Sequence, residues 1–166
     1  MDKLMFFGIE DNDDSICIEF VRTYSRDAHE SLAFLGYAPA LRGFEKIPGA
    51  WLMVVMDMLP DDFEMLSESK DRLSPSAFAN LLQAVNSLHN AGFVHGDIRD
   101  TNTMVCKTDE TKFMIIDFDW AGKIGEARYP ANVNHVGIER PKDALDGFEI
   151  LTDHDEVIQR NRFSWM

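Results

Sequence analysis

The stretch His95-Gly96-Asp97-Ile98-Arg99-Asp100-Thr101-Asn102 decides the fold of this chain, together with Asp117-Phe118-Asp119 a short hairpin further on. The first segment follows a long amphipathic helix pattern, and the second follows an apolar strand pattern. Polar side chains at the ends of rigid elements can be aimed at a common point. We therefore expect Asp97, Asn102 and Asp117 to converge.

The three convergent side chains are of the types that a magnesium-dependent phosphoryl transfer needs. Mg²⁺ takes oxygen ligands, usually one or two carboxylates plus substrate phosphates, and Asn102 and Asp117 suit that role. Transfer to a hydroxyl also needs a separate carboxylate that orients the hydroxyl and accepts its proton. Asp97 is the candidate for this base.

The pattern H-x-D-x-x-x-x-N followed by D-F resembles the catalytic and metal-binding loops of protein kinases. The similarity extends over residues 15–125. The phrases V-H-G-D at 94–97 and I-D-F-D-W-A-G at 116–122 are similar to those of small fungal kinase-like domains, in the branch related to aminoglycoside phosphotransferases. The resemblance implies an α+β, protein-kinase-like fold that uses ATP and Mg²⁺.

The resemblance also implies a division of the chain and a role for each matching residue. Residues 1–59 would form a partial N-lobe, with a short antiparallel sheet, one helix and the hinge, and residues 60–166 a small, mostly helical C-lobe. Asp97 would be the catalytic base, His95 a support for its loop, and Arg99 a contact near the transferred phosphate. The metal ligands would be Asn102 and Asp117.

The strand Val54-Val55-Met56-Asp57-Met58-Leu59 resembles the kinase strand that leads into the hinge. Met56 would then be the gatekeeper residue. Backbone groups of Asp57 and Leu59 would face the adenine of the nucleotide.

The chain departs from the kinase pattern at the site that grips the phosphates. Glu19 occupies the position of the strand lysine, and Asp27 on the next helix is the matching acid. One pair of unit charges about 4 Å apart is worth about 4 kcal/mol at an effective dielectric of 20, so this exchange is costly. Lys3 or Arg22 could compensate. Before the Glu19 strand there is one glycine, Gly8, and no glycine-rich loop, as in an amino-terminally truncated kinase-like domain.

Two functions therefore stay open. The first is an ATP-dependent phosphotransferase acting on an unidentified hydroxyl acceptor. Its Gly96, beside the catalytic aspartate, and Asp119, in place of the D-F-G glycine, favour the small-molecule branch. The second is an inactive pseudokinase that serves as a binding or regulatory module.

The periodicity predicts a strand, a helix, a hairpin, a second helix, two strands and a last helix. Taken singly, Asp100 and Asp119 are typical of turn or cap residues. In the first half, we expect a strand over 15–21, a helix capped by Ser25 and ended by Gly36 with Ala28, Leu32 and Leu35 on one face, and strands 41–44 and 51–56 joined by Pro48-Gly49. In the second half, we expect a helix from Ser74-Pro75 to Ala91-Gly92 and strands 103–106 and 113–116. A last helix has Thr152 and Asp155 as a capping box before Val157 and Ile158. The strand 51–56 is apolar throughout, which predicts cover on both faces.

Length and composition predict one soluble, monomeric domain in the cytoplasm. The chain has 166 residues, 45% apolar and 27% charged, with no secretory signal and no apolar run long enough for a bilayer. Its two cysteines, Cys17 and Cys106, lie among apolar neighbours and are expected to be buried thiols. A net charge of −13 argues against nucleic acid and anionic membranes as partners.

Overall fold

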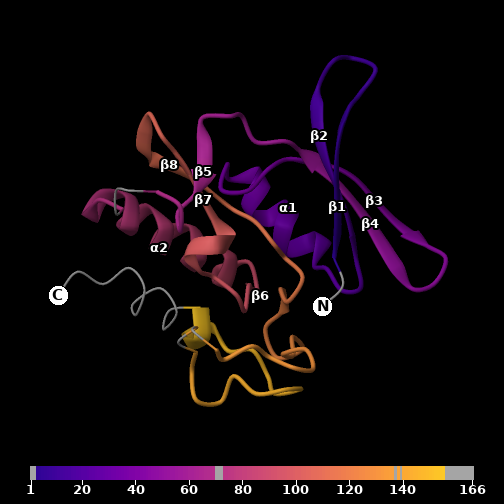
Figure 1. Ribbon diagram of the computed structural model, residues 1–166. Helices are drawn as coiled ribbons and strands as arrows, with labels where there is room; N and C mark the ends of the chain where they lie inside the picture. Colours follow the sequence, from indigo (N-terminus) through magenta and orange to yellow (C-terminus); the bar gives the residue numbers. More distant parts are fainter. Residues whose placement is uncertain (1–2, 70–72, 137, 139, 156–166) are drawn as a thin grey trace.

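The computed structural model describes residues 3–69, 73–136, 138 and 140–155. A four-stranded sheet and helix α1 form one part of the molecule, and helix α2, two small sheets and the C-terminal loops form the other (Figure 1). No helix within the described residues is both long and apolar enough to cross a bilayer.

The larger sheet is antiparallel throughout, with strand order β1-β2-β4-β3. Its bounds are β1 Leu4–Ile9, β2 Ser15–Val21, β3 Leu41–Ile47 and β4 Trp51–Asp57. The strand and the hairpin predicted here are present, with Pro48-Gly49 in the turn. The prediction that β4 is covered on both faces is wrong, because of its seven residues only Val54 and Met56 are buried. One face of β4 packs on the core, and the other stays partly open.

Helix α1, Arg26–Phe34, crosses behind this sheet with one buried face. Ser25 caps it, because its hydroxyl accepts the Ala28 N–H at 3.4 Å. Ala28, His29 and Leu32 are buried, whereas Leu35 lies at the C-cap and is exposed, contrary to its predicted place on the apolar face. Gly36, at φ +79°, ends the helix in a conformation that side chains disfavour.

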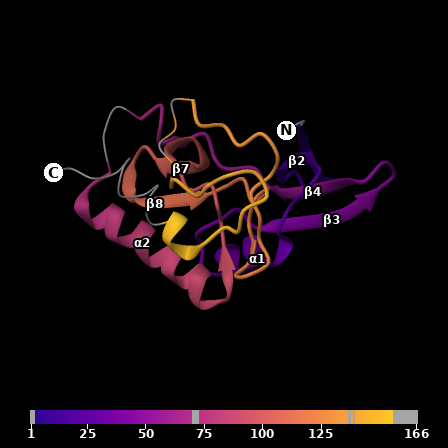
Figure 2. The same ribbon diagram turned by 90° about the horizontal axis from the view of Figure 1, so that it is seen from below.

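Helix α2, Pro75–Asn90, begins at the cap Ser74 as predicted, and its buried residues pack with those of α1 and β8. Figure 2 shows α2 alongside β7 and β8. A three-stranded sheet of order β5-β7-β8 lies beside it, and a two-stranded sheet joins β6 to β9. The bounds are β5 Phe63–Met65, β6 Phe93–Val94, β7 Thr103–Cys106, β8 Asp109–Ile115 and β9 Gly122–Lys123, with a 3₁₀ turn η1 at Asp100–Asn102. Among the described residues, the part of the molecule that follows β4 thus has one long helix, α2, and otherwise only short helical turns.

One core links α1, α2 and β8, and both cysteines are free and buried as expected. Burial raises the pKa of the Cys17 thiol to about 11, so this thiol stays protonated.

Residues 152–155 form a helical turn, but the capping box predicted there is wrong, because the Asp155 carboxylate accepts the backbone N–H groups of His95 and Gly96 instead. Val157 and Ile158 lie outside the described residues.

Candidate functional site

The loop that carries Asp97 is held by a buried carboxylate from the end of the described chain. Asp155 is fully buried and accepts the backbone N–H groups of His95 at 2.9 Å and Gly96 at 2.7 Å. Gly96 has φ +81°, and a Cβ added there would lie 2.8 Å from Ile150 Cδ1. Glycine is therefore required at this position, both by the backbone conformation and by the close packing.

Asp97 is buried, and both of its carboxylate oxygens have partners. Oδ1 accepts from Arg140 Nη2 at 2.8 Å, and Oδ2 accepts from Asn102 Nδ2 at 2.9 Å. Arg99 Nε lies 3.1 Å from Oδ2 as an ion pair without the angles of a hydrogen bond. The structure thus brings together Asp97, Arg99 and Asn102, three of the predicted site residues, and adds an arginine.

Arg140 is the residue of this site that the sequence analysis missed. Its side chain is 1% exposed, its Nε donates to the Asn134 carbonyl, and its guanidinium stacks over the Trp120 ring at 4.7 Å. No motif signals it, because it lies 43 positions after Asp97 in an irregular segment. The pairing depends on the tertiary fold, which brings Arg140 next to Asp97.

Asp117 reaches the same region through the backbone. The Ile116 N–H donates to the Asn102 carbonyl at 3.0 Å. Asp117 directly follows Ile116, so this hydrogen bond holds the backbone of Asp117 close to Asn102. Asp117 itself has φ +69°, a conformation rare for residues other than glycine, and strained residues of this kind cluster at functional sites.

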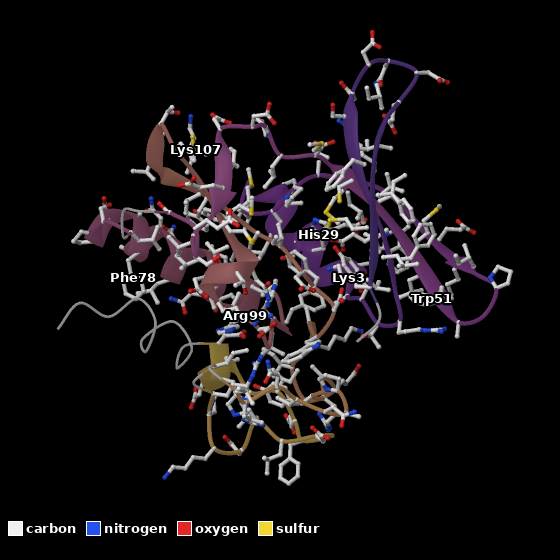
Figure 3. All side chains as sticks on the ribbon, in the orientation of Figure 1. Lys3, His29, Trp51, Phe78, Arg99 and Lys107 are labelled. Atoms are coloured by element: carbon white, nitrogen blue, oxygen red, sulfur yellow. The ribbon has the colours of Figure 1, made fainter. Side chains whose placement is uncertain are left out.

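A second group of carboxylates surrounds the amine of Lys3, which Figure 3 shows at the junction of the large sheet with the loops below it. Lys3 Nζ lies 3.2 Å from Glu19 Oε2, 3.3 Å from Asp117 Oδ1 and 3.8 Å from Asp119 Oδ1. Lys3 therefore approaches the acid that stands in place of the strand lysine. Asp119, expected to be a turn or cap residue, is buried inside this group.

Burial and mutual repulsion shift the ionisation of the group. Burial is the main cause that raises the pKa of Glu19, and burial together with the charge of Asp117 raises the pKa of Asp119 to about 8. Burial alone would lower the pKa of Lys3, but the attraction of Asp117, Glu19 and Asp119 outweighs it and raises that pKa. The amine is thus charged, and Asp119 is largely protonated at neutral pH.

The donor set suits a hard divalent cation that also has ligands from outside the chain. Glu19 Oε2 and Asp119 Oδ1 are buried without a hydrogen-bond partner, next to the carboxylate of Asp117. Among the described residues, however, no three Asp, Glu, His or Cys side chains converge closely enough to hold a metal by themselves. Mg²⁺ commonly completes such an incomplete oxygen site with water and phosphate oxygens.

An aromatic stack connects the two groups. The Phe118 ring lies parallel to His29 of α1 at 4.6 Å and contacts His95 edge-on at 5.0 Å. His29 Nε2 donates to the Pro39 carbonyl at 2.7 Å, and its Nδ1 accepts from Tyr24 Oη at 2.6 Å. Burial lowers the pKa of His29, so the neutral ring is the form that packs here.

The predicted gatekeeper and hinge residues lie at the end of β4. Met56 is buried and pairs with Cys17 across the sheet. The Asp57 N–H donates to Ala40 O at 2.9 Å, while among the described residues the amide of Leu59 makes no backbone hydrogen bond. A cavity of about 560 Å³, lined by residues 57–61, 38–40 and neighbours, lies against this segment.

Asp27, the predicted matching acid, is exposed in the first turn of α1. It lines a cavity of about 520 Å³ that Asp119 also lines. The α1 side chain that packs toward Phe118 is His29, two residues further on.

Comparisons with known proteins find similarity to protein kinases. Residues 65–140 match the sequence family described as "Fungal protein kinase". Citron Rho-interacting kinase of Mus musculus is 33% identical over 88 residues, which covers 49% of this chain and 4% of that protein. The solved structure of the Cydia pomonella granulovirus kinase PK-1 has a TM-score of 0.70 at 15% identity, covering 98% of this chain and 66% of that one.

The chain has a protein-kinase-like fold, and its residues 65–140 are similar to the fungal protein kinases. Its α+β, kinase-like fold, expected from the sequence, is confirmed. It spans about two thirds of the viral kinase and a small part of the citron kinase.

Proposed function

We propose that this domain binds ATP with Mg²⁺ and transfers the terminal phosphoryl group to a hydroxyl acceptor. One observation carries the proposal: Asp97 and Asn102 are hydrogen-bonded at 2.9 Å, and Asn102 is linked through its backbone to the residue before Asp117. Residues 1–59 act as the partial N-lobe with the hinge, and residues 60–166 as the C-lobe. Met56, Asp57 and Leu59 provide the adenine side of the site.

The residues of the chain divide the work. Asn102 and Asp117 hold the metal, which supplies charge neutralisation for the phosphates. Asp97 orients the acceptor hydroxyl and takes its proton, while His95, through its contact with Asp97 N–H at 3.3 Å, keeps the loop in shape. Arg99, beside Asp97, binds the transferred phosphoryl group.

A pseudokinase role is the second candidate, and a specific observation favours it. Arg140, Arg99 and Asn102 together engage both oxygens of Asp97, so a substrate hydroxyl would have to compete for an acceptor position. Glu19 in place of the strand lysine points the same way. In this role the domain binds a protein partner or a nucleotide without turnover.

Other features fit a monomeric cytoplasmic protein related to fungal kinases. The free, buried cysteines suit a reducing compartment. The match of residues 65–140 to the fungal family supports the relationship.

Thermal unfolding with Mg²⁺–ATP, followed by an ATP-hydrolysis assay, tests both candidates. A ligand at 100 times its dissociation constant stabilises the native state by about 2.7 kcal/mol, a readily measured shift. We expect a shift that Asp117→Asn abolishes, and turnover that Asp97→Asn abolishes, whereas Asp153→Asn, the same change at an exposed position, alters neither. A shift without turnover selects the pseudokinase, and no shift at millimolar nucleotide rejects nucleotide binding.

A further inference from the structure

Within the described chain, the amine of Lys3 is the one cation that forms ion pairs with Glu19, Asp117 and Asp119. It lies before β1, reaches Glu19 on β2, and meets Asp117 and Asp119 beyond β8. One positive charge thus faces three acidic side chains from two segments far apart in the sequence. The site as built has an excess of acidic groups over cations.

A purely structural ion pair does not account for the arrangement. Of the three contacts only that with Asp117 has hydrogen-bond geometry, so the ammonium, which has three N–H donors, is under-used. Glu19 Oε2 and Asp119 Oδ1 are buried and lack hydrogen bonds. Buried polar groups left unsatisfied in this way mark a place where an absent partner is needed.

The position of the amine makes a phosphate the fitting partner. Lys3 Nζ lies 3.3 Å from the Asp117 carboxylate, so a phosphate brought to Asp117 by a shared metal would come within reach of the amine. The Lys3 side chain remains 22% exposed, which leaves a path for a ligand. The two arginines that contact Asp97 do not take this role, because Arg140 is hydrogen-bonded to Asp97 and Arg99 is proposed above to bind the transferred phosphoryl group beside Asp97.

We propose that the Lys3 ammonium binds the phosphate chain of the nucleotide and supplies the positive charge that Glu19 denies to strand β2. This inference rests on the proposed nucleotide binding. The cation comes from the residue just before β1, the strand that pairs with β2, and lies 3.3 Å from Asp117. The site therefore keeps an amine for the phosphates, although an acid occupies the position where the kinase pattern has its lysine.

Titration of the protein with Mg²⁺–ATP, Mg²⁺–ADP and adenosine tests the inference. We expect Lys3→Met to weaken Mg²⁺–ATP binding about 10- to 100-fold, the range for a hydrogen bond to a charged group, and to leave adenosine binding unchanged. Lys3→Arg retains most of the affinity. Lys112→Met, the same change at an exposed lysine of β8, has no effect. The double variant Lys3→Met with Glu19→Lys, which moves the amine to β2, restores binding.

A labelling experiment on the unaltered chain covers the case in which Lys3→Met fails to fold. An acyl-phosphate derivative of ATP transfers its acyl group to an amine beside its phosphates, forming an amide and releasing ATP. Mass spectrometry should find Lys3 acylated and protected by excess Mg²⁺–ATP.

The outcomes separate this inference from the proposed function. If the wild-type chain binds ATP while Lys3→Met binds it equally or more tightly, or if labelling falls on another lysine, the inference is overturned and the proposed function stands. If the wild-type chain binds no nucleotide, both are overturned.

Discussion

The buried charges around Asp97 and those around Lys3 are balanced in opposite ways, with several cationic or donor groups on one carboxylate in the first region and several carboxyl groups on one amine in the second. At Asp97 one carboxylate is held by two guanidinium groups and an amide. At Lys3 three acidic side chains share one amine, and two of their oxygens have no hydrogen bond. Buried ions are tolerated when paired and hydrogen-bonded. Both oxygens of Asp97 have partners within the chain, although Arg99 Nε and Arg140 Nη1 beside them lack hydrogen bonds, whereas Glu19 and Asp119 each keep one buried oxygen without a hydrogen bond.

The difference teaches which region is built for stability and which for a ligand. In the Asp97 loop, Asp155 binds the backbone amides of the loop and Arg140 binds the Asp97 side chain, so the geometry of the loop is set before any substrate binds. The Lys3 group keeps raised pKa values at Glu19 and Asp119, a pattern typical of binding sites. A substitution should therefore cost stability in the first region and ligand affinity in the second.

Removing Arg140 should give the largest effect on stability. We expect Arg140→Met to lower the free energy of unfolding by about 3 kcal/mol, because it leaves the buried Asp97 carboxylate short of a partner. Urea denaturation measures the loss. The matched control is Arg26→Met, since Arg26 pairs with Glu30 at the surface and such pairs are worth about 0.5 kcal/mol. Equal losses in the two variants would show that Arg140 is not a structural partner of Asp97.

The aromatic stack between the two regions should make stability depend on pH. Burial lowers the pKa of His29, which also lies near Glu30 and His95. The unfolded chain takes up a proton on this histidine near pH 6.5 and the native chain only at lower pH, so the contribution of His29 to the free energy of unfolding falls as pH drops below about 6.5. The slope from this group is at most about 1.4 kcal/mol per pH unit. The contribution of Asp119 has the opposite sign, because its raised pKa of about 8 favours the native state at lower pH.

Urea denaturation between pH 7.5 and 5.5 measures this slope. His29→Gln should reduce it, whereas His135→Gln, at an exposed position, should leave it unchanged. A slope that survives His29→Gln intact would assign the pH dependence to other groups.

The sequence was sufficient for several helices and strands and for the Asp97 loop, but it predicted neither β1, β5, β6 and β9 nor the charges that surround the site. Caps, turn residues and apolar periodicity located β2, α1, the β3–β4 hairpin and α2, because these signals are local. Asp97 and Asn102 are only five residues apart in the sequence, so their proximity could also be predicted. Glu19 was identified as a misplaced acid from the same local alignment.

The missing parts are those that depend on long-range packing. Arg140 reaches Asp97, and Asp155 reaches His95, from segments with no repeating pattern. Asp119 has the sequence context of a turn residue, and only the tertiary structure shows it buried near Lys3. Contacts between side chains so far apart in the sequence depend on the complete fold, so no sequence motif predicts these contacts.

The smallest effect should come from an Asp→Asn change made once in each region. At Asp119 burial and the neighbouring Asp117 already keep the carboxyl largely protonated at neutral pH, so the amide of Asp119→Asn replaces a neutral group of similar shape. We expect its free energy of unfolding to stay within about 1 kcal/mol of the wild type. Asp97→Asn removes the charge that two arginines neutralise, and should cost about 2 kcal/mol more.

Denaturation of both variants at pH 7 without nucleotide provides the comparison. If Asp119→Asn were the more damaging change, the carboxylate would have to be charged and needed by Lys3 as a structural counter-ion. The amine would then be committed to the fold, with little capacity left for a phosphate. A near-neutral Asp119→Asn, by contrast, leaves Lys3 paired with Asp117 and Glu19 alone, the state in which an incoming phosphate competes with the fewest partners.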